Sequence, residues 1–292
     1  MPTSCELDAE STQGTYNPAL RIAPGDGDRN RKDRFEPRFE DRTEFPESFR
    51  TEFPEPARGS TDGGQSFGTI RTIGTANLPT NDTDCDLDGV DDTLVLNGDI
   101  RESTFANLAA DPLNSSNVYA AWNHFTSGSS EISFSRSTDG GTTWSTPVRI
   151  NDTVTRDQFS PRIATTIWFG ADPDSTIVNV SWYDRRNDAN NLNFDLYADG
   201  SSTLGASWTT DSRWTDTTSS LPDIHPGQDC EPSPCYLGDY NGMFSLNPGA
   251  DVVVSTWCDS RLTATGSAGT CPDGRSYPAS RPDLDIRAAV GC

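Results

Sequence analysis

Short runs of apolar residues recur along the second part of the chain, and each run ends at or just before a tryptophan. The runs cover residues 118–121, 177–181 and 252–255, and the tryptophans are Trp122, Trp182 and Trp257. A segment rich in Asp, Asn and Pro precedes each run. Short apolar runs bounded by turn-forming residues are typical of buried β-strands. The pattern therefore predicts a protein built from short strands joined by many turns.

A second pattern, Ser-x-Asp-x-Gly-x-[Ser/Thr]-[Trp/Phe], occurs three times in step with the first. Its Asp can accept hydrogen bonds from the amides of a turn, and its Gly tolerates positive φ. We expect the aromatic residue to start the next strand and to pack inward. The third copy has Thr203 in place of Asp. The hairpin residues are Ser60, Asp62, Gly64, Phe67, Ser137, Asp139, Gly141, Trp144, Ser201, Gly205 and Trp208.

Together the two patterns define a repeating unit of four antiparallel strands. The units span about 104–151, 157–216 and 234–292, and the hairpin at 60–67 belongs to an earlier, partial unit. The third unit lacks a clear fourth strand. Repeated four-stranded units are typical of β-propeller blades, which close with ~4–8 blades. The predicted fold is an all-β propeller with three clear blades and a partial one, either incomplete or completed by the N-terminal segment.

The charge of the chain narrows the possible partners. The 292 residues carry a formal net charge of -22, of which residues 59–292 contribute -18. An acidic surface repels phosphates, so nucleic acid is not an expected partner. No apolar run approaches the ~18 residues of a membrane helix, so no membrane span is expected.

Two cysteine pairs are close enough in sequence to staple loops. Cys230 and Cys235 flank four residues, and Cys258 and Cys271 flank a segment rich in Gly, Thr and Ser. Two disulfides would place the protein in an oxidising compartment, outside the cell or at its surface. The alternative is that all seven cysteines are free thiols.

Residues 1–58 have a different composition from the rest. Two near-identical segments, RTEFPES and RTEFPEP, lie at 42–48 and 50–56, and several prolines forbid a continuous helix. We interpret this segment as a low-complexity arm, either disordered or extended and docked through its Phe side chains. In the second case the arm could mediate self-association.

The hairpin pattern resembles the Asp boxes, or BNR repeats, of the sialidase superfamily. The phrases STDGGTTWSTPVRI (137–150), WYDRRND (182–188) and YLGDY (236–240) are similar to bacterial sialidase-like propeller proteins. The resemblance covers roughly residues 59–292. It implies the propeller fold, in which Asp boxes are structural and lie away from the binding centre, but it does not imply one activity.

The resemblance also indicates which catalytic residues to look for. Sialidases of this superfamily use three Arg on the substrate carboxylate, a Tyr–Glu nucleophile pair and an Asp acid/base. Outside the arm the only Glu are Glu102, Glu131 and Glu231, and none has a matching context. Weak candidates for a central pocket are Arg186, Arg261, Asp239 and Tyr240. Alternatively, Arg186 and Arg261 form a repeated structural pair with Asp184 and Asp259 in a Trp-x-Asp-x-Arg motif, sharing one face of a strand.

Residues 82–92 predict a calcium site. Six of these eleven residues are Asp, and a Gly at the sixth loop position allows a sharp turn. Ca²⁺ prefers ~6–8 oxygen ligands, which alternating carboxylates can supply. The predicted ligands are Asp84, Asp86, Asp88, the carbonyl of Val90, and Asp92. Bound calcium would be structural, and catalysis is not implied. The alternative is a solvated acidic loop.

Three functions follow from these expectations. The first is a secreted sialidase-like propeller that recognises glycans, whether or not it hydrolyses them. The second is a non-catalytic structural or adhesive protein that assembles through its arm. The third is an active exo-sialidase, a glycoside hydrolase.

Overall fold

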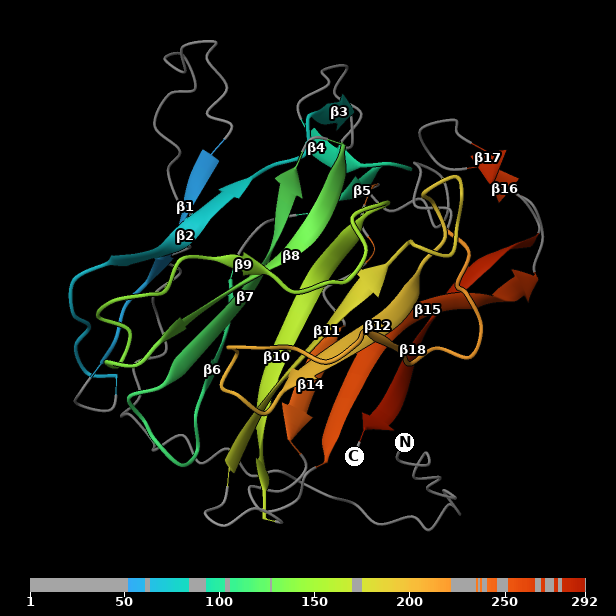
Figure 1. Ribbon diagram of the computed structural model, residues 1–292. Coiled ribbons are helices and arrows are strands. Elements are labelled where there is room, and N and C mark those ends of the chain that lie inside the picture. Colours follow the sequence, from blue (N-terminus) through green and yellow to red (C-terminus); the bar gives the residue numbers. More distant parts are fainter. Residues whose placement is uncertain are drawn as a thin grey trace, which may run out of the picture. The chain divides into compact units, whose positions relative to one another are not determined.

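The chain folds into β-sheets. The computed structural model describes residues 52–60, 64–83, 93–102, 106–126, 128–169, 175–221, 235, 237, 241–245, 252–265, 269–270, 276–277 and 280–291. These residues belong to one compact unit and contain strands but no helix (Figure 1). Within them, therefore, no helix could span a membrane. The all-β expectation is confirmed.

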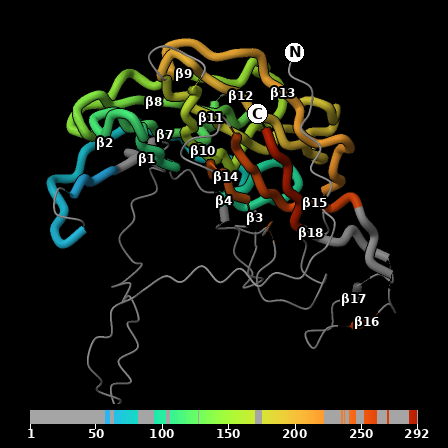
Figure 2. Tube along the Cα trace, turned by 90° about the horizontal axis from the view of Figure 1, so that it is seen from below, coloured from blue at the N-terminus to red at the C-terminus, as the bar shows by residue number. Residues whose placement is uncertain are grey.

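Two four-stranded antiparallel sheets match the first two predicted repeat units. One contains β6 (Asn107–Ala110), β7 (Val118–Thr126), β8 (Ser129–Ser137) and β9 (Val148–Arg149) in that order. The other contains β10 (Gln158–Trp168), β11 (Ser175–Asp184), β12 (Asp195–Ser201) and β13 (Ser212–Arg213). The same succession can be followed along the chain trace in Figure 2. Both tryptophan runs are central strands, as their apolar composition predicts.

The third predicted unit has three strands among the described residues. They are β14 (Gly242–Ser245), β15 (Val253–Thr265) and β18 (Ser280–Gly291). The strands β16 (Gly269–Thr270) and β17 (Ser276–Tyr277) form a separate pair. The expectation that this unit shows no fourth strand agrees with the described part of the chain.

Before the first repeat, two small sheets precede β6. The strands β3 (Asn81–Thr83), β4 (Thr93–Leu96) and β5 (Ile100–Arg101) form one sheet. The strands β1 (Glu52–Ala57) and β2 (Arg71–Asn77) form the other. Most of the predicted arm, residues 1–51, lies outside the described residues, but its last part is β1. The sheet region thus begins before residue 59. Each strand of a two-stranded sheet has one unpaired edge, where a residue needs no N–H donor, so prolines are tolerated in β1. The register of β1 also shifts next to Pro56.

The Ser-x-Asp-x-Gly segments form hairpin turns of one geometry. In each copy the Gly amide donates to the Ser hydroxyl at 2.8 Å. The Gly residues have similar φ angles, 87° for Gly64, 85° for Gly141 and 79° for Gly205. In the second copy Asp139 Oδ1 accepts the Thr143 amide at 2.8 Å.

The Asp of the motif can be replaced by Thr without losing this geometry. In the third copy the hydroxyl of Thr203 accepts the Ser207 amide at 2.8 Å, the same distance as for Asp139. The apparent departure from the motif therefore preserves its key hydrogen bond. Asp62, in the first copy, lies outside the described residues.

We expected the aromatic residue of each hairpin to begin the next strand, and this expectation is wrong. The aromatic residue lies four residues before that strand in all three copies, because β2, β9 and β13 start at Arg71, Val148 and Ser212. Trp144 packs against a buried cluster of Ile73, Ala76, Ala120 and Trp122. The Trp208 ring lies 4.8 Å from that of Phe134 in β8. The Trp208 hairpin therefore packs on the preceding repeat sheet, and the Trp144 hairpin packs on a cluster to which the earlier strand β2 and its own sheet both contribute.

Phe67 departs from the expected inward packing. Its side chain is exposed, as are all the residues from Gly64 to Ile70. The first hairpin has no preceding sheet among the described residues, which explains why its aromatic residue remains uncovered.

Candidate functional site

The repeated Trp-x-Asp-x-Arg motif is a structural clamp. The indole of Trp182 donates to Asp184 at 3.0 Å, and the other carboxylate oxygen accepts the amide and Nε of Arg186 at 2.8 and 2.9 Å. Trp257, Asp259 and Arg261 repeat this arrangement at 3.3, 2.9 and 2.9 Å. Arg186 lies just beyond the end of β11. The prediction of a repeated structural pair agrees with this geometry.

Both arginines are also engaged by a second carboxylate. Arg186 donates to Asp211 and lies 4.1 Å over the ring of Tyr197, and Arg261 donates to Asp216. These hydrogen bonds raise the pKa of both guanidinium groups, although burial opposes the shift. A guanidinium held by two carboxylates has little capacity left for a ligand, so Arg186 and Arg261 are poor candidates for a substrate site.

A different polar cluster lies where β10 begins, at the sheet end away from the Asp-box hairpins. There Gln158 pairs with Asp184, whereas the hairpin from Ser201 leaves β12 at the opposite end. We call Glu102, Ser160, Arg162 and Asn241 the Ser160 cluster. The register of β10 shifts between Phe159 and Arg162. Ser160 itself has a φ of 51°, a conformation that costs an L-residue roughly 1–2 kcal/mol.

Hydrogen bonds connect the four members of the Ser160 cluster. The Ser160 hydroxyl contacts both carboxylate oxygens of Glu102, at 2.9 and 2.8 Å. The Asn241 amide donates to the Ser160 carbonyl at 2.8 Å, and Arg162 Nε donates to the Asn241 carbonyl at 2.9 Å. All four residues are partly exposed. A carboxylate, a guanidinium, an amide and a hydroxyl are thus brought together at a strained bulge, an arrangement often found at functional sites.

Beside this cluster lies a fully buried arginine. Arg185 donates from Nη1 to the Asn97 carbonyl at 2.7 Å and to Asp157 at 3.2 Å, and its side chain is 0% exposed. Among the described residues, its Nε and Nη2 atoms have no hydrogen-bond partner. Burial lowers the pKa of Arg185, while Asp157, Asp188 and Glu102 favour the charged form. The two unpartnered nitrogens form one edge of the guanidinium fork, the geometry that binds a planar oxyanion.

Tyr183 and Cys258 belong to the buried hydrophobic core next to the Ser160 cluster. The Tyr183 hydroxyl accepts the Cys258 amide at 2.8 Å, and burial raises the pKa of Tyr183 well above its ordinary value. Burial likewise raises the pKa of the Cys258 thiol to about 11. Cys258 is a free thiol, so the predicted Cys258–Cys271 disulfide is wrong for this structure. Because its strand buries the side chain in the core beside Trp257, the thiol is unavailable to a surface loop.

Cys235 is disulfide-bonded, as expected, and packs against Val95. Cys230 lies outside the described residues, so the pairing of Cys230 with Cys235 stays a prediction. Asp239, Tyr240 and the predicted calcium ligands Asp84–Asp92 also lie outside them. Within the described part of the chain, no group of three acidic, His or Cys side chains could hold a metal ion.

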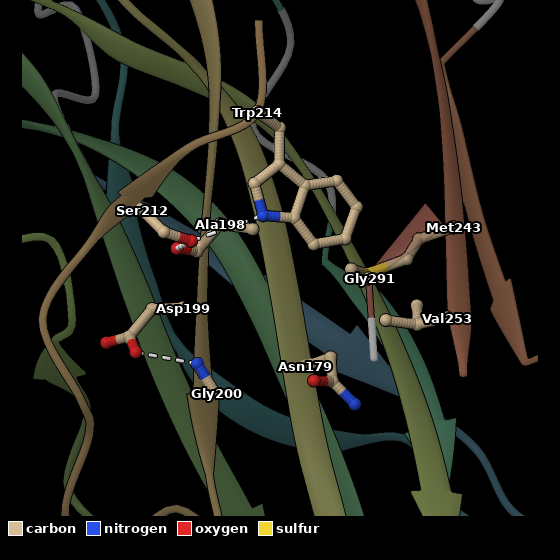
Figure 3. A pocket seen from close by; sticks show the side chains of 9 residues that line it. All are labelled: Asn179, Ala198, Asp199, Gly200, Ser212, Trp214, Met243, Val253 and Gly291. Atoms are coloured by element: carbon tan, nitrogen blue, oxygen red, sulfur yellow. Dashed lines mark hydrogen bonds between the residues drawn. The ribbon is translucent and has the colours of Figure 1, made fainter. Parts of the chain in front are cut away.

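A small hollow lies between the sheet of β10–β13 and that of β14, β15 and β18. Its volume is about 180 Å³. Figure 3 shows Trp214 on one side, Met243 and Val253 on another, and Asn179 below them. The walls are completed by Ala198, Asp199, Gly200, Ser212 and Gly291. The hollow shares no residue with the Ser160 cluster.

Asp199 makes folding stability depend on pH. Its side chain is buried, Oδ2 has no partner, and burial together with Asp211 raises its pKa to about 6. A carboxyl whose pKa is raised on folding stabilises the fold most below its unfolded pKa of about 4, and this contribution is lost as pH rises through 6. We expect the free energy of unfolding of Asp199→Asn, measured relative to wild type, to increase by on the order of 1–2 kcal/mol between pH 4 and pH 7.5.

Urea unfolding of wild type and Asp199→Asn at the two pH values measures this difference directly. Asp216→Asn, at an exposed carboxyl with a lowered pKa, is the control and should show no such gain. If Asp199→Asn and wild type differ in unfolding free energy by the same amount at pH 4 and pH 7.5, the raised pKa of Asp199 is contradicted.

Sequence reasoning missed most of the Ser160 cluster. Glu102 was noticed only as one of three Glu outside the arm, and Asn241 directly follows the candidates Asp239 and Tyr240. The Ser-Pro step at 160–161 was the one local signal of a break in β10. Searches against models of protein families and against curated proteins find no match to this chain.

Proposed function

We propose that this protein is a secreted, sialidase-like Asp-box β-propeller that recognises glycans through the Ser160 cluster. The observation that carries the proposal is the cluster itself, in which partly exposed polar groups converge at a strained bulge beside the buried Arg185. The common hairpin geometry supports the Asp-box interpretation. Closure of the sheets into a propeller, and structural calcium at residues 82–92, are part of the same proposal.

The chemistry of the cluster suits sugar hydroxyl groups. Each hydroxyl can donate to a carboxylate such as Glu102 and accept from a guanidinium such as Arg162. Hydrogen bonds to charged groups are stronger than those between neutral groups.

Binding is better supported than hydrolysis. Tyr183, which interacts electrostatically with Arg162 and Glu102, is buried and its oxygen accepts a backbone amide, so it is not placed as a nucleophile. Arg186 and Arg261 are held by carboxylates of the fold. The active exo-sialidase therefore remains the second candidate. The adhesive alternative depends on residues 1–51, which lie outside the described part of the chain.

Glu102→Gln tests the proposal. The substitution keeps the size of the side chain but removes the charge that Ser160 contacts, so we expect glycan affinity to fall by about tenfold or more. The measurement is a screen of neutral and sialylated oligosaccharides followed by calorimetric titration of those that bind. Asp216→Asn, at a carboxyl that is 82% exposed, is the matched control and should bind like wild type.

Two outcomes would overturn the proposal. One is that wild type retains no glycan, and the other is that Glu102→Gln and wild type bind equally well. A fluorogenic sialoside, tested with calcium between about pH 4 and pH 8, separates the two candidate functions. Release of the fluorophore would favour the active sialidase.

A further inference from the structure

The hollow between the second and third repeat sheets has rigid walls. Its lining side chains come from strands or residues next to them, with Asn179 in β11, Met243 in β14 and Val253 in β15. Trp214 follows β13 directly. Walls built on strands hold their shape better than walls built on long loops, so the hollow is a preformed feature of the fold.

Trp214 is fixed in orientation at one side of the hollow. Its indole Nε1 donates to the Ser212 hydroxyl at 3.2 Å, and that hydroxyl donates to the Ala198 carbonyl. A Cβ at Gly291 would lie 2.7 Å from the indole, so glycine is required for the indole to sit there. Gly291 has no positive φ, and the backbone itself therefore does not demand glycine. Glycine at position 291 therefore serves to leave room for the Trp214 indole.

Asn179 supplies a polar group to the same hollow. Its amide nitrogen donates to Thr166 at 3.2 Å, which fixes the orientation of the side chain. Within the described residues its Oδ1 accepts no hydrogen bond, and a Cβ at Gly200 would lie 3.5 Å from that oxygen. Gly200 therefore leaves open space beside an unused acceptor.

These features select a ligand class. The lining combines a flat indole, a thioether, an oriented amide and the buried carboxyl of Asp199, and it contains no Lys or Arg that would attract an anion. A volume of about 180 Å³ equals that of roughly six waters, enough for one small ring. A pyranose ring has an apolar C–H face for the indole and hydroxyl groups for Asn179.

We propose that this hollow binds a single uncharged pyranose residue, separately from the Ser160 cluster. The C–H face of the sugar packs on Trp214, and one hydroxyl donates to Asn179 Oδ1. Since one ring offers about a dozen non-hydrogen atoms, the dissociation constant is expected in roughly the millimolar range.

The test follows tryptophan indole N–H resonances of the whole chain by NMR during titration with methyl β-D-glucopyranoside. We expect a saturable shift of the Trp214 resonance and no shift for Trp168, an exposed tryptophan in β10. Gly200→Val should weaken binding at least tenfold by filling the space beside Asn179, and its remaining indole resonances report that the fold is kept. Asn179→Ala is the second variant, and sorbitol is the acyclic control ligand.

Several results would overturn the inference. They are the absence of a saturable shift, equal binding by Gly200→Val or Asn179→Ala and wild type, and equal binding of sorbitol. Glu102→Gln separates this inference from the proposed function, because it should leave the Trp214 shift intact. If Glu102→Gln abolishes sugar binding while Gly200→Val does not, the Ser160 cluster is the only glycan site and the hollow is not one.

Discussion

Replacing Asp157 with alanine is expected to lower the free energy of unfolding by about 3–5 kcal/mol. Asp157 is 3% exposed at its side chain and faces Arg185, which is 0% exposed. Its carboxylate also accepts the Ser130 amide at 3.0 Å and the Asn191 side chain at 2.8 Å. Removal of the carboxylate would leave a buried guanidinium without its ion pair and a buried amide without its acceptor. The measurement is equilibrium unfolding in urea.

The control for this prediction is Asp216→Ala. Asp216 also pairs with an arginine, Arg261, but its side chain is 82% exposed, so its loss should cost far less than the loss of Asp157. Asp157→Asn keeps the shape and removes the charge, and we expect an intermediate loss. Similar losses for Asp157→Ala and Asp216→Ala would show that the buried pair does not stabilise the fold as argued.

Gly205→Ala is expected to cost about 2–4 kcal/mol. Gly205 has a φ of 79°, and an added Cβ would lie 2.3 Å from the ring of Phe134, which belongs to the buried core. The ring cannot retreat easily, because Tyr119 and Trp208 pack against it. The substitution therefore combines backbone strain with overpacking, and urea unfolding measures the sum.

The same motif provides the matched control. Gly141 has a φ of 85°, and its Cβ would come no closer than 3.8 Å to Trp144. Gly141→Ala should therefore show backbone strain alone, about 1–2 kcal/mol. If both variants lose the same stability, the contact of the third hairpin with Phe134 contributes nothing, and the packing of this hairpin on the preceding sheet would need another explanation.

Local patterns were sufficient to predict the two four-stranded sheets. The runs ending at Trp122 and Trp182 are central strands, and the hairpin pattern identified turns of a common geometry, including the copy in which Thr203 replaces Asp. These features depend on residues within about ten positions of one another. The pairing of Asp184 with Arg186 was predictable for the same reason.

The candidate site depends on contacts that no local pattern encodes. Glu102 meets Ser160 across 58 residues, and Asn241 reaches Ser160 across 81. Their meeting requires a register shift in β10, which only the packed sheets reveal. The cysteines illustrate the opposite error. Cys258 and Cys271 are near in sequence, yet the strand that carries Cys258 turns its thiol into the core.

The contacts of Arg185 bear on the order of folding. Its guanidinium reaches back 28 residues to Asp157 and 88 residues to Asn97, and Asn97 in turn contacts the Asn190 carbonyl. Contacts between residues far apart in sequence can form only after the later residue has left the ribosome. Such non-local contacts also slow folding. Successive repeats in a linear array can fold one after another, because each contacts only its neighbours. Here Asn97, between β4 and β5, acquires its contacts with Arg185 and Asn190 only after the second repeat has been synthesised, so folding should be delayed and cooperative.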